Sequence, residues 1–162
     1  MDFMHKKDNK DLEILNKALG AEQFAIAAYE LAAGTGLLSE GVIQVAKTFQ
    51  GHHGQHAHKI HETIKSLGGE AVKPLSQEEY AKKLPSGLTD EKSIIHYALT
   101  LEKGATITYL NAIPEFENHK IAQAAASILG DEAMHWATLR NALGLFPVHI
   151  GFIPLSADEV ED

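Results

Sequence analysis

The chain has 162 residues, of which 44% are hydrophobic and 22% charged, and its formal net charge is −8. This length and composition are ordinary for one soluble domain with a sizeable core. The negative charge and the lack of a basic run argue against a nucleic-acid surface, because Lys and Arg hold the phosphates there. Since the sequence has no Cys, a metal site must use His and carboxylate ligands.

No segment of the sequence indicates a membrane or a secretion signal. The first eleven residues, MDFMHKKDNKD, are charged and lack the apolar core of a signal peptide. No run of about eighteen apolar residues occurs in the sequence. We therefore expect a cytoplasmic protein whose partners include neither membrane nor nucleic acid.

Two long helices are predicted in the first half of the chain. The first runs over about 9–33 and stops at the Gly-Thr-Gly turn 34–36. The second begins near Ser39, continues over about 40–67 and ends at the glycine pair 68–69.

A break of about twenty residues follows, at 68–89, where Pro and Gly interrupt the periodic pattern. Ser76 and Glu79 form the signature of a capping box at the start of a short amphipathic segment, 76–84. Neighbouring antiparallel helices usually need only about two to eight linking residues. The length of this connection therefore predicts a crossover that runs the length of a helical bundle.

Two further helices are predicted in the second half. The third covers about 90–112 and ends before Pro114, and the fourth follows the short link 115–118 and closes at Gly144. The remaining residues, 145–162, contain Pro and Gly and predict an extended arm with an acidic end. We expect one all-α domain over residues 1–162, with an antiparallel four-helix bundle at about 9–144.

Each predicted helix has an apolar stripe that is interrupted by at least one carboxylate or imidazole side chain suited to metal binding. The stripe of the fourth helix, stepping by three or four residues, reads Ile121, Ala125, Ile128, Glu132, His135, Leu139, Leu143. The interrupting residues of the other three stripes are Glu22 and Tyr29, His53 and His56, and Glu102 and Tyr109. A buried ionised carboxylate is unfavourable unless it is paired or bound to a cation. These stripes therefore predict a compensating charge in the core.

The interrupting residues recur at an offset of about half the chain. The offset is 80 residues for Glu22 and Glu102 and for Tyr29 and Tyr109, and 79 for His53 and Glu132 and for His56 and His135. Such a period suggests a duplicated helix pair. In each half one helix has a Glu followed seven residues later by a Tyr, and the other has two ligand-type residues spaced i, i+3. Glu22, His53, Glu102 and Glu132 lie at a similar depth along their helices, so the pattern predicts a two-metal site in a four-helix bundle.

In these residues the chain resembles the ferritin-like (rubrerythrin-like) di-iron carboxylate superfamily, over about 9–144. That superfamily builds its site from one Glu on each of two helices and a Glu-x-x-His on each of the other two. The resemblance implies six metal ligands: Glu22, His53, His56, Glu102, Glu132 and His135. His53 departs from the pattern, because it stands where the superfamily has a glutamate.

The resemblance implies two iron ions per chain and the oxidation of iron with dioxygen or peroxide. Replacing a Glu by His53 leaves a ligand charge of −3 instead of −4 and favours iron or zinc, since imidazole suits these ions and carboxylate also suits manganese. Zinc or manganese are the alternative metals. The alternative functions are a non-redox, zinc- or single-metal-binding structural or stress-associated bundle, and an interaction bundle without metal.

The sequence leaves two further questions open, the role of two tyrosines and the choice of histidines on the second helix. Tyr29 and Tyr109 are either core aromatics or residues that hydrogen-bond to the glutamates and assist the chemistry. His58 and His61 form a competing i, i+3 pair, but their use as ligands would turn the apolar stripe of the second helix outward. Because the Pro- and Gly-containing arm cannot add the C-terminal helix of shell-forming ferritins, we expect a homodimer or a monomer.

Overall fold

The computed structural model describes residues 3–159, with side chains from Lys10 onward. Every regular element among these residues is a helix, which confirms the all-α class. The elements in chain order are α1 (Phe3–Gly34), α2 (Glu40–Ser66), α3 (Gln77–Ala81), α4 (Glu91–Ala112), η1 (Ile113–Glu115), α5 (His119–Ala142) and η2 (Ala157–Glu159). The four long helices are those that the sequence predicted, and η1 and η2 are single 3-10 turns.

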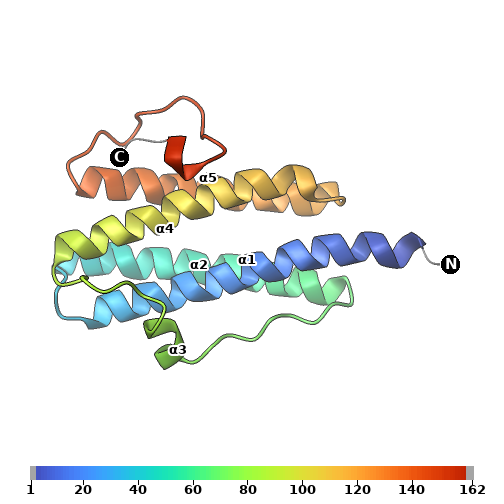
Figure 1. Cartoon of the computed structure of the whole chain (residues 1–162), viewed down its shortest axis with the longest axis horizontal. Coiled ribbons are helices and arrows are strands. Elements are labelled where there is room, and N and C mark those ends of the chain that lie inside the picture. The colour runs from blue at the N-terminus through green and yellow to red at the C-terminus, as the bar shows by residue number, and fades with distance from the viewer. Residues whose placement is uncertain (1–2, 160–162) are drawn as a thin grey trace. The chain divides into compact units, whose positions relative to one another are not determined.

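The chain divides into two compact units, Met1–Glu91 and Lys92–Asp162. The first contains α1, α2 and α3, and the second contains α5 and nearly all of α4. Within each unit the two long helices lie side by side and run antiparallel (Figure 1). The division falls where the half-chain repeat predicted the second helix pair to begin.

The bounds of the helices follow from local sequence signals, with one exception. α2 has Ser39 as its N-cap and is closed by Gly68, whose φ of 73° is a conformation that favours glycine. The exception is α1, which begins at Phe3 and not near Asn9. No Pro or Gly stands between these two residues, so nothing in the sequence stops the helix from continuing toward the N-terminus.

In the first unit the crossover between α2 and α4 lies along α1. The Asn16 side chain donates to the Glu70 carbonyl oxygen at 3.1 Å and accepts from the Val72 amide at 2.7 Å. Gly69 packs closely beside it, because a Cβ there would clash with a Leu12 methyl carbon and the Leu12 side chain would have to shift. The predicted capping box is present at the start of α3, where Ser76 and Glu79 bond reciprocally. The crossover thus covers one flank of the α1–α2 pair and leaves the facing sides of these helices for the buried side chains.

In the second unit the C-terminal arm folds back onto its own helices. Arg140 of α5 donates through Nε to the Phe146 carbonyl oxygen at 3.0 Å, and Asn111 of α4 donates to the Leu155 carbonyl oxygen at 2.9 Å. The His149 ring of the arm packs edge-on against Trp136 of α5 with centroids 5.6 Å apart. The arm is irregular up to η2, and its final residues, 160–162, lie outside the described part of the chain.

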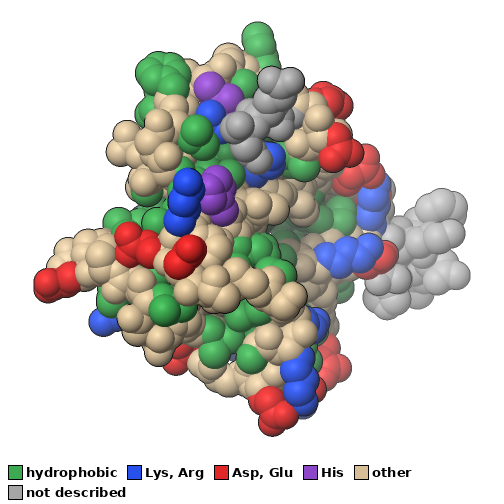
Figure 2. Space-filling view, turned by 60° about the vertical axis from the view of Figure 1, so that its left-hand side comes forward, with side chains coloured by type: hydrophobic (Ala, Val, Ile, Leu, Met, Phe, Trp, Pro, Cys, Tyr) green, Lys and Arg blue, Asp and Glu red, His purple; other side chains and the backbone are tan. Residues whose placement is uncertain are grey.

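The surface is mixed in character. On the face drawn in Figure 2, acidic and basic side chains are interspersed with apolar ones. Within residues 3–159, no helix is both long and apolar enough to cross a membrane.

Candidate metal centre

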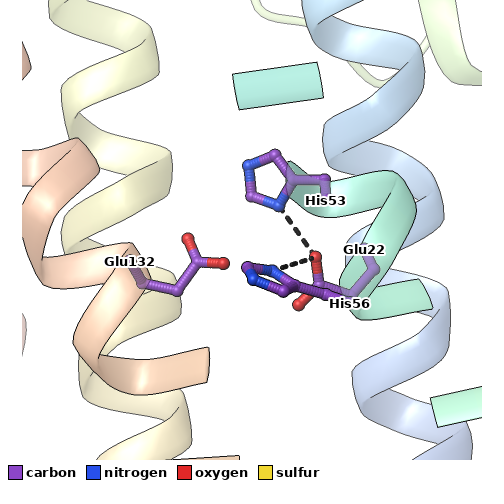
Figure 3. Close-up of side chains that lie close together, drawn as sticks. All are labelled: Glu22, His53, His56 and Glu132. Carbon is purple, nitrogen blue, oxygen red and sulfur yellow. Dashed lines mark hydrogen bonds and ion pairs between the residues drawn. The ribbon is translucent and has the colours of Figure 1, made fainter. Parts of the chain in front are cut away.

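Three of the predicted ligands come together on the facing sides of α1 and α2. Glu22 projects from α1, and His53 and His56 project toward it from successive turns of α2 (Figure 3). Nδ1 of His53 lies 2.8 Å from Oε2 of Glu22, and Nδ1 of His56 lies 3.5 Å from the same oxygen. The donor atoms of the three residues all lie within 4.8 Å of one another, so one cation can contact all three. We call this group the N-terminal cluster.

The N-terminal cluster is buried and has aromatic neighbours. The Glu22 and His53 side chains are each 3% exposed and His56 is 12% exposed, so His56 is the most accessible member. The Tyr29 ring stacks on the His53 imidazole at a centroid distance of 5.6 Å, and Phe49 packs edge-on against Tyr29 at 5.9 Å. Tyr29 therefore contacts a predicted ligand directly, through its ring face.

The other three predicted ligands come together between α4 and α5. Glu102 projects from α4, and Glu132 and His135 from α5. Nδ1 of His135 lies 3.3 Å from Oε2 of Glu102 and 3.7 Å from Oε2 of Glu132. Their donor atoms lie within 4.8 Å of one another, and each residue is at most 1% exposed. We call this group the C-terminal cluster.

A further carboxylate, not singled out from the sequence, contacts this cluster. Oδ2 of Asp131 lies 3.3 Å from Nε2 of His135, on the opposite edge of the ring from the two glutamates. A carboxylate on the second nitrogen of a metal-binding histidine fixes the tautomer and the orientation of the ring. The i, i+4 spacing of Asp131 and His135 was the available sequence signal.

The carboxylates of the C-terminal cluster change the acidity of its histidine. Burial alone disfavours the imidazolium and lowers the pKa of His135. The hydrogen bonds and negative charges of Glu102 and Glu132 outweigh burial and raise this pKa to about 9. In the metal-free chain at neutral pH, His135 is therefore protonated, and a metal ion that binds its Nδ1 must displace a proton.

This protonation predicts a pH-dependent stability of the metal-free protein. The pKa of His135 is about 9 in the folded chain, above its ordinary value of 6.5. Its contribution to the free energy of unfolding is therefore fully present below pH 6.5 and is lost as the pH rises through 9. Thermal denaturation of chelator-treated protein across this range measures the loss. The His135→Gln variant lacks the titrating group and should show a flatter profile, and an unchanged profile would contradict this assignment.

The structure also places the remaining residues considered from the sequence. Ile60 and Ile64 of α2 are 3% and 0% exposed, so this apolar stripe faces inward. His58 is exposed and the His61 side chain is 45% exposed, with Nδ1 3.2 Å from Oε1 of the exposed Glu62. These two histidines therefore do not join the N-terminal cluster. Tyr109 is 7% exposed on α4, two turns beyond Glu102.

The donors present fit a transition-metal ion. The clusters offer three carboxylates and three imidazoles, the ligand types that iron takes in oxygen- and nitrogen-donor sites. Three carboxylates buried to this degree carry a large desolvation cost, which bound cations offset. The composition of the clusters, rather than any one residue, indicates a metal centre.

The chain is similar to known proteins with a ferritin-like fold. A family model described as "Ferritin-like domain" matches residues 10–145. A conserved hypothetical protein from Mycobacterium tuberculosis superposes with a TM-score of 0.74 at 16% identity, covering 83% of this chain and 98% of that one. Ferritin-like, diiron-carboxylate proteins from Bacillus anthracis superpose with a TM-score of 0.69 at 22% identity, covering 85% and 97%. No curated protein matches the sequence. At these identities the structural likeness shows the fold alone.

Proposed function

Because the chain belongs to the ferritin-like domain family, we propose that its two clusters together hold two iron ions, and that it oxidises iron with dioxygen or peroxide. The observation that carries the proposal is the pair of buried Glu/His clusters, one in each helix pair. The similar Bacillus anthracis proteins are described as diiron-carboxylate proteins, which supports iron as the metal.

Under this proposal each cluster supplies three ligands. Glu22, His53 and His56 would hold one ion, and Glu102, Glu132 and His135 would hold the other. Bound iron would supply one-electron chemistry toward dioxygen or peroxide.

The protein residues contribute orientation, exclusion of water and control of one proton. Asp131 holds the His135 ring through Nε2, so that Nδ1 is directed to the glutamates. His135 would give up its Nδ1 proton to serve as a ligand there and would take it back in the metal-free chain. Tyr29 packs against His53 and keeps water from that face of the imidazole. We also propose that Tyr29 and Tyr109 assist the chemistry, since each is buried seven residues beyond a glutamate ligand on its helix.

The test is a comparison of iron oxidation with and without the protein. Anaerobic, metal-free protein is loaded with ferrous iron, and the bound iron is counted. Oxygen or peroxide is then added, and the remaining ferrous iron is followed with a ferrous-specific chelator. We expect about two iron ions per chain, as in di-iron carboxylate sites, and oxidation faster than that of iron in buffer. Oxidation no faster than in buffer would favour the non-redox metal-binding alternative.

A further inference from the structure

The C-terminal arm carries an exposed apolar surface that neither metal cluster uses. Among the residues with described side chains, the four most exposed large apolar residues are Phe152 at 93%, Val148 at 72%, Phe146 at 70% and Leu155 at 65%. All four lie between positions 146 and 155 of the arm, and we call them the arm patch. We infer that two copies of the chain dimerise through this patch, each arm covering the arm patch of the other copy.

The arm patch differs from the scattered apolar residues of an ordinary surface. Single exposed apolar side chains are common in soluble proteins, but a group of them is not. Residues 141–157 contain no Asp, Glu, Lys or Arg, in a chain of which 22% is charged. Apolar side chains also project at the upper end of the view in Figure 2, the end at which Figure 1 draws the arm. Such an uncharged apolar group is typical of a surface that another molecule covers.

The arm presents the patch from a backbone that is already held in place. Nε of Arg140 donates to the Phe146 carbonyl oxygen at 3.0 Å, and Asn111 donates to the Leu155 carbonyl oxygen at 2.9 Å. Between these two anchors a histidine ring of the arm packs on α5. The main chain is therefore tied to α4 and α5 at both ends of the patch, while the patch residues stay exposed. Because little of the backbone must be ordered on association, the entropic cost of dimerisation is reduced.

The area of the arm patch is of the size that a dimer needs. Complete burial of a Phe side chain removes about 150–250 Å² from water, so the exposed fractions of Phe146 and Phe152 correspond to about 250–400 Å² in each copy. Two copies together supply about 500–800 Å² from these rings. Val148 and Leu155 of both copies bring the total to about the 1,000 Å² that a specific interface requires.

The charge distribution favours a second copy of the chain over other partners. The formal net charge of −8 opposes self-association in general, and it also opposes contact with an anionic lipid surface. In a two-fold symmetric dimer the same surface meets itself, so charges near the axis face their own copies. A surface without charged side chains avoids this repulsion. A basic partner, in turn, would be attracted by acidic side chains, which the arm patch lacks.

The first experiment is sedimentation equilibrium of the full-length chain over a range of concentrations. The chain has a mass of 17.6 kDa, and we expect a species of twice this mass. Phe152→Glu places one charge in each arm and should weaken the dimer by at least about thirtyfold, as the loss of a central buried aromatic does. Leu37→Glu changes an exposed leucine in the link before α2 and is the matched control, which should dimerise like the unmodified protein. Circular dichroism checks that both variants form their helices.

The second experiment leaves the arm patch intact. Because the chain has no Cys, Gly151→Cys introduces a single thiol per copy, beside Phe152. A Cβ at Gly151 would meet no atom within 4 Å, so the substitution is tolerated. A short bis-maleimide should join two such chains into a covalent dimer. Gly41→Cys, at an exposed glycine of α2 with equal room for a side chain, is the matched control and should stay monomeric in the same reaction.

Three results would overturn the inference. The chain could sediment as a monomer at every concentration, or its dimer could survive Phe152→Glu unchanged, which would place the contact on another face. A monomer that floats with phosphatidylcholine vesicles, and loses this binding in Phe152→Glu, would assign the arm patch to a lipid surface. The patch contains none of the six ligands, so these outcomes leave the proposed iron oxidation unaffected, and a failure of iron oxidation would leave the dimer unaffected.

Discussion

Replacing Glu102 with alanine is expected to abolish the accelerated oxidation of ferrous iron. Glu102 is 1% exposed, and its Oε2 lies 3.3 Å from the Nδ1 of His135. The substitution removes one carboxylate of the C-terminal cluster and also a partner of His135. The remaining ligands then hold iron weakly, and the rate should fall to that of iron in buffer.

Two control variants test whether the loss of oxidation is specific to the Glu102 carboxylate. Glu117→Ala changes an exposed glutamate in the link before α5 and should oxidise iron like the unmodified protein. Glu102→Gln keeps the volume of the side chain but removes its charge, so it separates loss of a ligand from loss of packing. The measurements are the time course of ferrous iron and the number of iron ions bound per chain. Full acceleration in Glu102→Ala would show that α4 supplies no essential ligand.

Removal of the metal by a chelator is expected to lower the melting temperature by about 5–10 °C. A ligand present at about a hundred times its dissociation constant adds about 2.7 kcal/mol to the free energy of unfolding. In a chain of this length, each kcal/mol corresponds to about 2–4 °C. The physical source is the buried charge: Glu22, Glu102 and Glu132 are at most 3% exposed, and the bound cations offset the cost of burying them.

The control for this experiment is a chain that lacks a ligand in each cluster. His56→Ala combined with His135→Ala should melt at a temperature that does not respond to the chelator. The measurement is thermal denaturation followed by circular dichroism, with and without chelator and after readdition of ferrous iron. A melting temperature of the unmodified protein that is indifferent to chelator would argue against a preformed site in the core.

The apolar periodicity of the sequence was enough to predict the helices and to identify Glu22, His53, His56, Glu102, Glu132 and His135 as candidate ligands. A carboxylate or imidazole on an otherwise apolar stripe is unusual, because burial of a polar group is costly without a partner. A polar residue on such a stripe therefore indicates a partner or a bound ion in the core. The halves of the chain repeat the pattern, which strengthened the prediction of two helix pairs.

The position of the crossover and of the arm was not accessible from the sequence. Asn16 holds the backbone at Glu70 and Val72, and Gly69 allows the close approach to Leu12. These contacts join residues more than fifty positions apart, and their partners cannot be assigned from local periodicity. The fold of the arm likewise depends on Asn111 and Arg140, which reach carbonyl groups of an irregular segment.

The sequence by itself determined which residue types face the core of each helix, because helical spacing and the cost of burying charge act locally. Only the tertiary structure decided the contacts of each side chain. It set Asp131 against the far nitrogen of His135 and stacked Tyr29 on His53. It also brought Glu102 and Glu132 together at His135, which raises the pKa of His135 to about 9. These effects depend on rotamers and on distances between helices, because hydrogen bonds and charge interactions change steeply over a few ångströms.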